Sequence, residues 1–147
     1  MTNFWLVLSA LCRPSVLLLL LSFSASAQYA IVSATPSPPA QLSLTKAKLV
    51  FLGKSSSVKG IGRVRLIDFP SGNADRTAFY KAFLNKNEAE MNRIWTSLAF
   101  SGRGTPPEES SSEDYSAIRE WLQQNPEGLG YLPLEHVGDL NVLLEVH

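Results

Sequence analysis

Apolar and polar positions change their spacing several times along the chain, and each change marks the boundary of a predicted element. Compact apolar runs bounded by turn residues predict strands at residues 29–34, around 64–67, at 128–132 and at 141–146. Apolar residues recurring every three to four positions predict amphipathic helices at 42–52, 74–84, from Glu88 onwards and at 113–124. Strands that alternate with helices indicate an α/β layer architecture, although the order of the strands cannot be read from this pattern.

The segments between these elements contain turn-forming and polar residues. Residues 54–62 are polar and contain glycine, which predicts an exposed loop, and residues 101–107 predict a stiff turn. A short turn of helix led by Pro133 is expected before the closing strand. Four large aromatic residues are interpreted as packing in the core or at its edge: Trp95, Tyr115, Trp121 and Tyr131.

The first 27 residues have the pattern of a secretory signal. An apolar run from Ser15 to Phe23 is followed by Ala25-Ser26-Ala27, which places small residues where a signal peptidase reads them. We therefore expect a signal peptide at 1–27, cleavage before Gln28, and a mature domain at 28–147 in the periplasm or outside the cell. The apolar run is short for a membrane span, so no stable span is expected after cleavage. A retained anchor stays open as the alternative, because Arg13 is the only early charge.

Composition restricts the functions open to the mature chain. Cys12, the only cysteine, lies in the predicted leader, so the mature domain has no disulfide and no cysteine-based site. Loss of Arg13 leaves 12 basic and 13 acidic residues, a net charge of −1, which does not favour nucleic-acid binding. A local basic cluster is either a solvated surface or a source of positive potential for an anion. It comprises Lys46, Lys48, Lys54, Lys59, Arg63 and Arg65.

The residues give no support for an enzyme, a metal site or a cofactor. His136 and His147 are the only histidines, and neither has an acidic or thiol partner at ligand spacing. No Gly-x-Ser-x-Gly pattern occurs, and no base is evident for a serine nucleophile. Residues 102–105 contain glycines but lack the Lys-Ser/Thr pair of a nucleotide-binding loop.

The junction between the second strand and the following helix is the best candidate for a ligand site. Pro70 to Asn73 form a turn, and the free backbone N–H groups at the start of a helix attract anions. The candidate oxyanion-binding residues are Ser71, Gly72, Asn73 and Arg76. Turn chemistry and helix capping explain the first three equally well. For Arg76, the alternative is a surface ion pair with Asp75 or a neighbour.

Four motifs occur in an order that resembles the phosphate-binding periplasmic proteins of ABC transporters, in particular short single-domain relatives. They are Leu49-Val50-Phe51-Leu52-Gly53-Lys54, the Ser71-Gly72 turn, residues 100–107 (FSGRGTPP) and residues 125–131 (NPEGLGY). The resemblance covers nearly all of the mature chain. It implies an α/β fold consisting of a single lobe of a type II periplasmic-binding-protein-like sandwich, a small phosphate-like ligand and an ABC permease as partner.

The chain departs from that family in ways that affect the expected ligand. Ser71 and Gly72 match the family turn, Asn73 replaces a threonine, and Ile67 stands where the family has an arginine, a role for which Arg76 is a substitute. One lobe supplies only half of a closed site, so weak oxyanion binding is expected. The alternative is an envelope interaction module that keeps the fold and binds a protein partner instead of a ligand.

Overall fold

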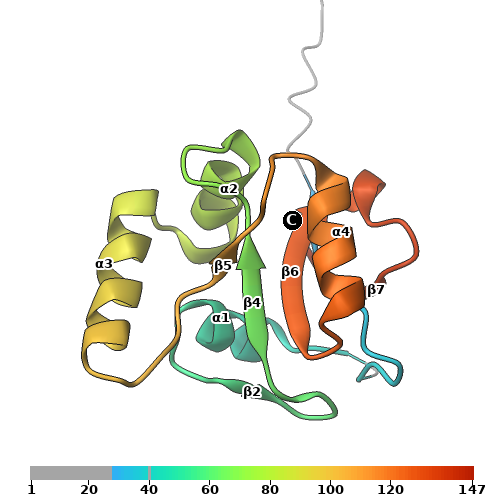
Figure 1. Cartoon of the computed structure of the whole chain (residues 1–147), viewed down its shortest axis with the longest axis horizontal. Coiled ribbons are helices and arrows are strands. Elements are labelled where there is room, and N and C mark those ends of the chain that lie inside the picture. The colour runs from blue at the N-terminus through green and yellow to red at the C-terminus, as the bar shows by residue number, and fades with distance from the viewer. Residues whose placement is uncertain (1–27, 40) are drawn as a thin grey trace, which may run out of the picture.

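A computed structural model describes residues 28–39 and 41–147, so the predicted signal peptide lies outside the described residues. Its centre is a five-stranded mixed sheet with the strand order β5-β4-β6-β1-β7 (Figure 1). This is the α/β class that the alternating pattern predicts. The bounds of the strands are Tyr29–Ser33 (β1), Arg65–Asp68 (β4), Glu108–Glu109 (β5), Gly128–Pro133 (β6) and Asn141–Val146 (β7).

The sheet has a parallel half and an antiparallel half. β4 pairs in parallel with β5 on one side and with β6 on the other. β1 runs antiparallel to both β6 and β7, with a register shift against β7 between Ile31 and Val32. All residues of β1 and β6 are buried, as expected for central strands covered on both faces.

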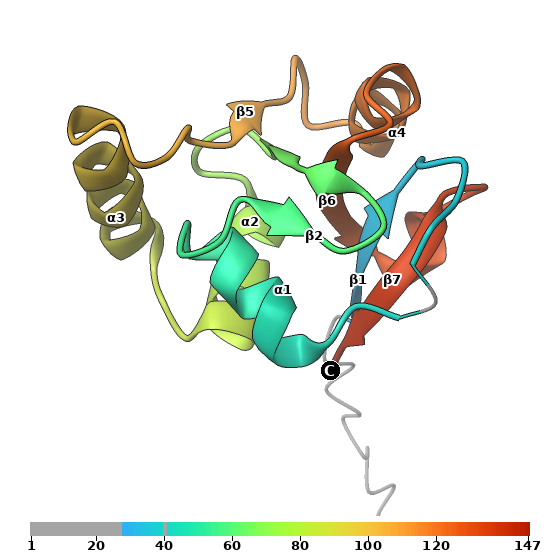
Figure 2. The same cartoon turned by 90° about the horizontal axis from the view of Figure 1, so that it is seen from below.

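Helices cover both faces of the sheet. Figure 2 shows α4 on one face and α1 and α2 on the other, with α3 beyond the β5 edge. The bounds are Leu44–Phe51 (α1), Ala74–Phe79 (α2), Glu88–Phe100 (α3) and Tyr115–Gln124 (α4). A π-helical segment at Tyr80–Leu84 continues α2, and a 3-10 turn at Leu134–His136 follows β6.

The two faces of β6 meet different helices because its side chains alternate. Gly130 faces α4, and a Cβ built there would lie 2.7 Å from Ile67 Cγ2 and 3.5 Å from Ile118 Cγ2, so only glycine fits without movement. Tyr131 points to the opposite face and stacks on Phe79 of α2, with ring centroids 3.7 Å apart. The core is therefore continuous from α4 through the sheet to α2.

Two details differ from the expectations drawn from the sequence. Residues 54–62 do not form a simple exposed loop, because Ser57–Val58 (β2) and Gly62–Arg63 (β3) pair as a hairpin that buries Val58. The fourth helix begins at Tyr115 rather than Glu113. The expected packing of Tyr115 and Trp121 is confirmed, because both are half-buried and pack against the core from its edge.

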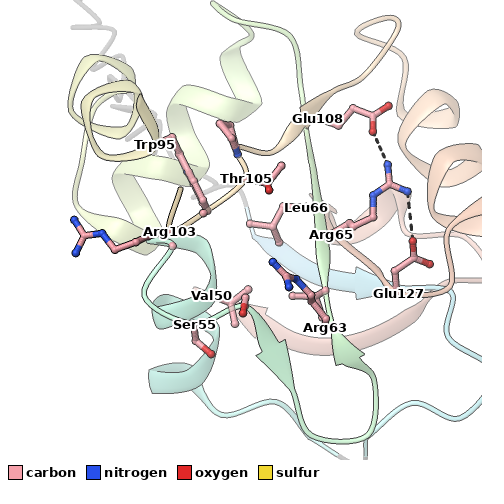
Figure 3. A pocket seen from close by; sticks show the side chains of 15 residues that line it. Val50, Ser55, Arg63, Arg65, Leu66, Trp95, Arg103, Thr105, Glu108 and Glu127 are labelled. Atoms are coloured by element: carbon pink, nitrogen blue, oxygen red, sulfur yellow. Dashed lines mark hydrogen bonds and ion pairs between the residues drawn. The ribbon is translucent and has the colours of Figure 1, made fainter. Parts of the chain in front are cut away.

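A cavity of about 660 Å³ lies at the beginning of β4 (Figure 3). Its walls come from the end of α1, from β3 and β4, from Trp95 of α3 and from the loop between α3 and β5. No helix in the described part of the chain is long and apolar enough to cross a membrane.

Candidate functional site

The turn after β4 is fixed by backbone geometry and by one capping side chain. Gly72 has φ +82°, which L-residues rarely adopt, and the Asn73 N–H donates to the Pro70 carbonyl at 3.1 Å. Asn73 is the N-cap of α2, and its Oδ1 accepts from the Arg76 N–H at 3.1 Å. These contacts confirm the predicted turn and place its backbone and Arg76 side by side.

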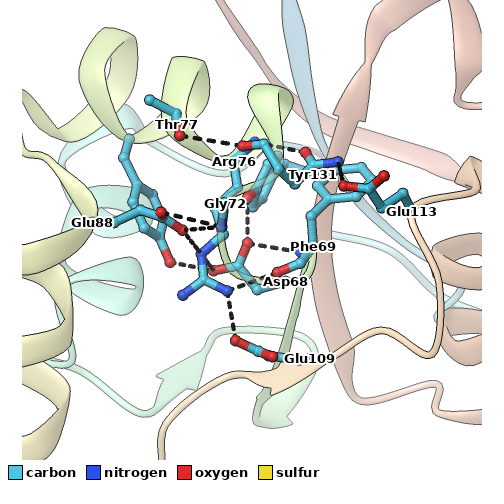
Figure 4. Close-up of polar contacts among 11 residues, drawn as sticks. Asp68, Phe69, Gly72, Arg76, Thr77, Glu88, Glu109, Glu113 and Tyr131 are labelled. Atoms are coloured by element: carbon cyan, nitrogen blue, oxygen red, sulfur yellow. Dashed lines mark hydrogen bonds and ion pairs between the residues drawn. The ribbon is translucent and has the colours of Figure 1, made fainter.

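A carboxylate of the chain itself lies at this turn. The Gly72 N–H donates to both oxygens of Glu88, each at 3.2 Å (Figure 4). Arg76 Nε lies 2.8 Å from Glu88 Oε1 as an ion pair, but its N–H makes no hydrogen bond within the described residues. The turn and the guanidinium therefore face one anionic group, and that group is a glutamate at the start of α3.

Arg76 is buried and reaches several acceptors, so it is not the surface residue of the alternative interpretation. Only 5% of its surface is exposed, and its Nη1 donates to the Phe69 carbonyl at 2.7 Å and to Glu109 Oε1 at 2.9 Å. Burial alone would lower the pKa of Arg76, but Asp68 and the other neighbouring acidic groups raise it above its ordinary value. The side chain is held as a cation.

Asp75, the partner that the surface interpretation gave to Arg76, bonds elsewhere. Its two carboxylate oxygens accept from Tyr29 Oη and Tyr115 Oη, each at 2.8 Å. Asp75 therefore connects the first turn of α2 to β1 and α4 and does not take part in the cluster around Arg76.

Asp68 lies beneath the turn in the core. Its carboxylate accepts from Tyr80 Oη, from Tyr131 Oη and from the Phe69 N–H, the last at 2.8 Å, and it lies 3.8 Å from Arg76 Nε. Burial raises the pKa of Asp68 by more than the hydrogen bonds from Tyr131 and Tyr80 lower it. The pKa values of both tyrosines are also raised, by burial and by the nearby Asp68, so both phenols keep their protons at neutral pH.

The charges around the turn do not favour a second anion. Asp68, Glu88 and Glu109 all lie within ion-pair distance of the single Arg76 guanidinium. Glu113 adds a further carboxylate, 3.4 Å from Asn73 Nδ2. An incoming phosphate would therefore have to displace Glu88 and would meet repulsion from the remaining acidic groups.

The structure brings together three of the four residues proposed from the sequence. Gly72, Asn73 and Arg76 form one hydrogen-bonded unit with their neighbours, whereas Ser71 is exposed and makes no hydrogen bond within the described residues. The sequence analysis overlooked Glu88 and Glu109 as their partners. The sequence signal for Glu88 was its place as the first helical residue after the Asn87 cap. The signal for Glu109 was its place just after Pro107, where it is the second residue of β5.

Comparison with known proteins supports the fold. No family model matches the chain, and no curated protein matches it. Among solved structures, a phosphate ABC transporter substrate-binding protein with bound phosphate from Clostridium perfringens matches at 19% identity and a TM-score of 0.59. That match covers 80% of this chain and 45% of the other.

Two further structures agree with the first. An ABC-type phosphate transport receptor from Vibrio cholerae matches at 12% identity and a TM-score of 0.59, covering 80% of this chain and 46% of that protein. PstS from Borrelia burgdorferi matches at 14% identity and a TM-score of 0.57, covering 80% and 47%. The fold is that of phosphate-binding transport proteins. The chain spans less than half the length of each of these three proteins, and at these identities the likeness concerns fold alone.

Proposed function

We propose that this protein is a solute-binding-like lobe that binds a small phosphate-like oxyanion weakly, in competition with its own Glu88. The single observation that carries the proposal is the convergence of the Gly72 N–H and the Arg76 guanidinium on one carboxylate. A phosphate oxygen needs the same donors as a carboxylate oxygen. The Arg76 Nε–H that faces Glu88 has no hydrogen-bond acceptor within the described residues, so this same N–H is available to an oxygen of such a ligand.

Weak affinity follows from the same contacts. Glu88 is tethered at the site, so a free anion has to compete with a local carboxylate of high effective concentration. Ser71 and Gly72 are also exposed, so water reaches the turn and screens a charge bound there. Ser71 adds an exposed hydroxyl at the turn, whereas the buried Asn73 side chain already bonds to the Arg76 N–H and to Glu113.

Removal of the competing carboxylate tests the proposal. We expect phosphate to bind the wild type with a Kd above about 1 mM and to bind Glu88→Ala at least about fivefold more tightly, as measured by titration calorimetry. Glu88→Gln keeps the shape of the side chain without its charge, and it should give an intermediate affinity. Glu120→Gln is the matched control, because Glu120 is exposed on α4 and makes no ion pair within the described residues.

One further variant completes the test. Arg76→Gln in the Glu88→Ala background should abolish the gain in affinity, because it removes the cation that faces the ligand. The proposal is wrong if folded wild type and both Glu88 variants give no heat at about 10 mM phosphate or sulfate.

The second candidate is an interaction module that retains the fold without a ligand. The observation in its favour is that Glu88 already satisfies the donors of the turn. This function predicts that Glu88→Ala lowers stability without any response to anions. Recovery of an envelope protein with the wild type, and its loss when the surface around Ser71 is changed, would support the module.

A role in ABC transport is part of the same proposal. The neighbours are named as phosphate transport proteins, so an ABC permease is the partner we propose for the oxyanion-binding function. The predicted signal peptide and the proposed periplasmic or secreted location agree with that role. Co-purification with the permease subunits would test it.

A further inference from the structure

The cavity at the beginning of β4 lies at the opposite end of this strand from the turn with Ser71 and Gly72. Arg63 and Arg65 precede and open β4, and both line the cavity, whereas Asp68 closes β4 beside the turn. A cavity of about 660 Å³ is within the range of small-molecule sites in proteins. The two sites can therefore be tested separately.

The inner wall of this cavity is apolar. Val50 of α1, Leu66 of β4 and Trp95 of α3 are buried core residues whose surfaces reach the cavity, and Pro106 covers it from the loop. Gly53 and Gly104 lie close to the Trp95 ring, because a Cβ built at these positions would lie 3.0 Å and 3.5 Å from Trp95 Cζ3. A flat apolar group would find a matching surface there.

The cations around the cavity divide into paired and unpaired ones. Arg65 donates to Glu108 Oε2 at 2.9 Å, to Glu127 Oε1 at 3.4 Å and to Asn125, so its charge is compensated. Arg63 has no hydrogen-bond acceptor and no ion-pair partner within the described residues. Figure 3 shows its guanidinium turned toward the space between Val50 and Leu66, with no contact drawn to it.

A second cation lies next to a residue that lines the cavity. The Lys46 ammonium donates to Ser55 Oγ at 2.6 Å, and Ser55 lines the cavity. Within the described residues, Lys46 forms no ion pair with a carboxylate. The basic cluster noted in the sequence thus supplies Arg63 in the cavity wall and Lys46 next to it, and Arg103, which also lines the cavity, forms no ion pair within the described residues.

We propose that this cavity binds an organic anion in which one carboxylate or phosphate group is attached to a flat apolar body. The apolar body packs against Val50, Leu66 and Trp95. The anionic group pairs with Arg63 and lies near Lys46. This site does not depend on the oxyanion site at the turn, so either can fail while the other stands.

A titration followed by NMR amide shifts tests the proposal with 2-naphthoate as the probe. We expect saturable shifts at Gly53, Arg63, Gly104 and Thr105, and none at the turn 71–73. The neutral analogue 2-naphthalenemethanol should bind about fivefold to tenfold more weakly than naphthoate. Inorganic phosphate, which lacks the apolar body, should leave the cavity amides unshifted at the same concentration.

Variants separate the contribution of charge from that of shape. Arg63→Gln should weaken naphthoate binding about fivefold to tenfold and remove its advantage over the alcohol, whereas the exposed Arg93→Gln on α3 should leave it unchanged. Thr105→Phe should weaken both ligands by filling the cavity. Equal affinity of wild type and Arg63→Gln, or saturable shifts at 71–76 instead of the cavity, would overturn the proposal.

Discussion

Asp68 is a buried residue whose surroundings raise the pKa of its carboxyl group. It closes β4 with its carboxyl group in the core, where it accepts from two tyrosines, and burial raises its pKa above the ordinary value. The folded state therefore holds its proton more firmly than the unfolded chain. Binding of this proton stabilises the folded state. The stabilisation is complete at a pH below the pKa of Asp68 in the unfolded chain, and it is lost as the pH rises through the higher pKa of Asp68 in the folded state.

Replacement of Asp68 by asparagine tests the direction of this pH dependence. The free energy of unfolding of the wild type, relative to Asp68→Asn, should be largest near about pH 4 and should decrease as the pH approaches about 8. Urea denaturation across that range measures the difference. Tyr80 and Tyr131 do not titrate in this window, because their pKa values are raised above 10.0. A difference that grows with pH would show that Asp68 has a lowered pKa instead.

The turn after β4 could be predicted from single residues, whereas the partners of Arg76 could not. Pro70, Gly72 and Asn73 predict the turn and the cap because their backbone preferences are local. The partners of Arg76 were not predictable in this way. Glu88 and Glu109 come from two later segments, and only the packing of α3 and β5 beside β4 brings them to the guanidinium.

Among the elements, the long periodic helices and apolar strands were predictable and the shortest pieces were not. The spacing of Met91, Ile94, Trp95 and Leu98 predicts α3, and the structure confirms a helix over Glu88–Phe100. The hairpin of β2 and β3 has two residues in each strand, too few for an alternating pattern, and Val58 is its only buried residue. The order of the strands depends on long-range pairing, which local periodicity does not encode.

The contact between α2 and β6 is the element-scale feature with the clearest energetic consequence. Phe79 is fully buried and stacks on Tyr131 with an interplanar angle of 6°. Phe79→Leu should lower the free energy of unfolding by about 1–2 kcal/mol, because it removes this stacking and leaves a space in the core. Chemical denaturation measures the loss.

The control for this prediction is on the neighbouring helix. Phe100 at the end of α3 is 94% exposed, so Phe100→Leu should change the free energy of unfolding by less than about 0.5 kcal/mol. Equal effects of the two substitutions would mean that the stack between Phe79 and Tyr131 does not stabilise the protein.

At the scale of the whole molecule, the first described strand lies directly after Gln28, the predicted first residue of the mature chain. β1 starts at Tyr29, and the carbonyl of Gln28 accepts from the Leu134 N–H at 2.9 Å. The Gln28 side chain lies 3.1 Å from His147 Nδ1, which holds the two ends of the domain together. A mature chain that starts at Gln28 therefore keeps every strand of the sheet that the structure describes.

Expression of the full chain in a Gram-negative host tests this start. We expect the protein in the periplasmic fraction, with an intact mass that corresponds to residues 28–147 or to its pyroglutamate form. Substitution of Ala27 by a bulky residue should block cleavage, because signal peptidase requires small side chains there. Wild-type protein that keeps residues 1–27 and stays with the membrane would instead support the retained anchor, and an anchored lobe would act at the membrane surface rather than as a diffusing binding protein.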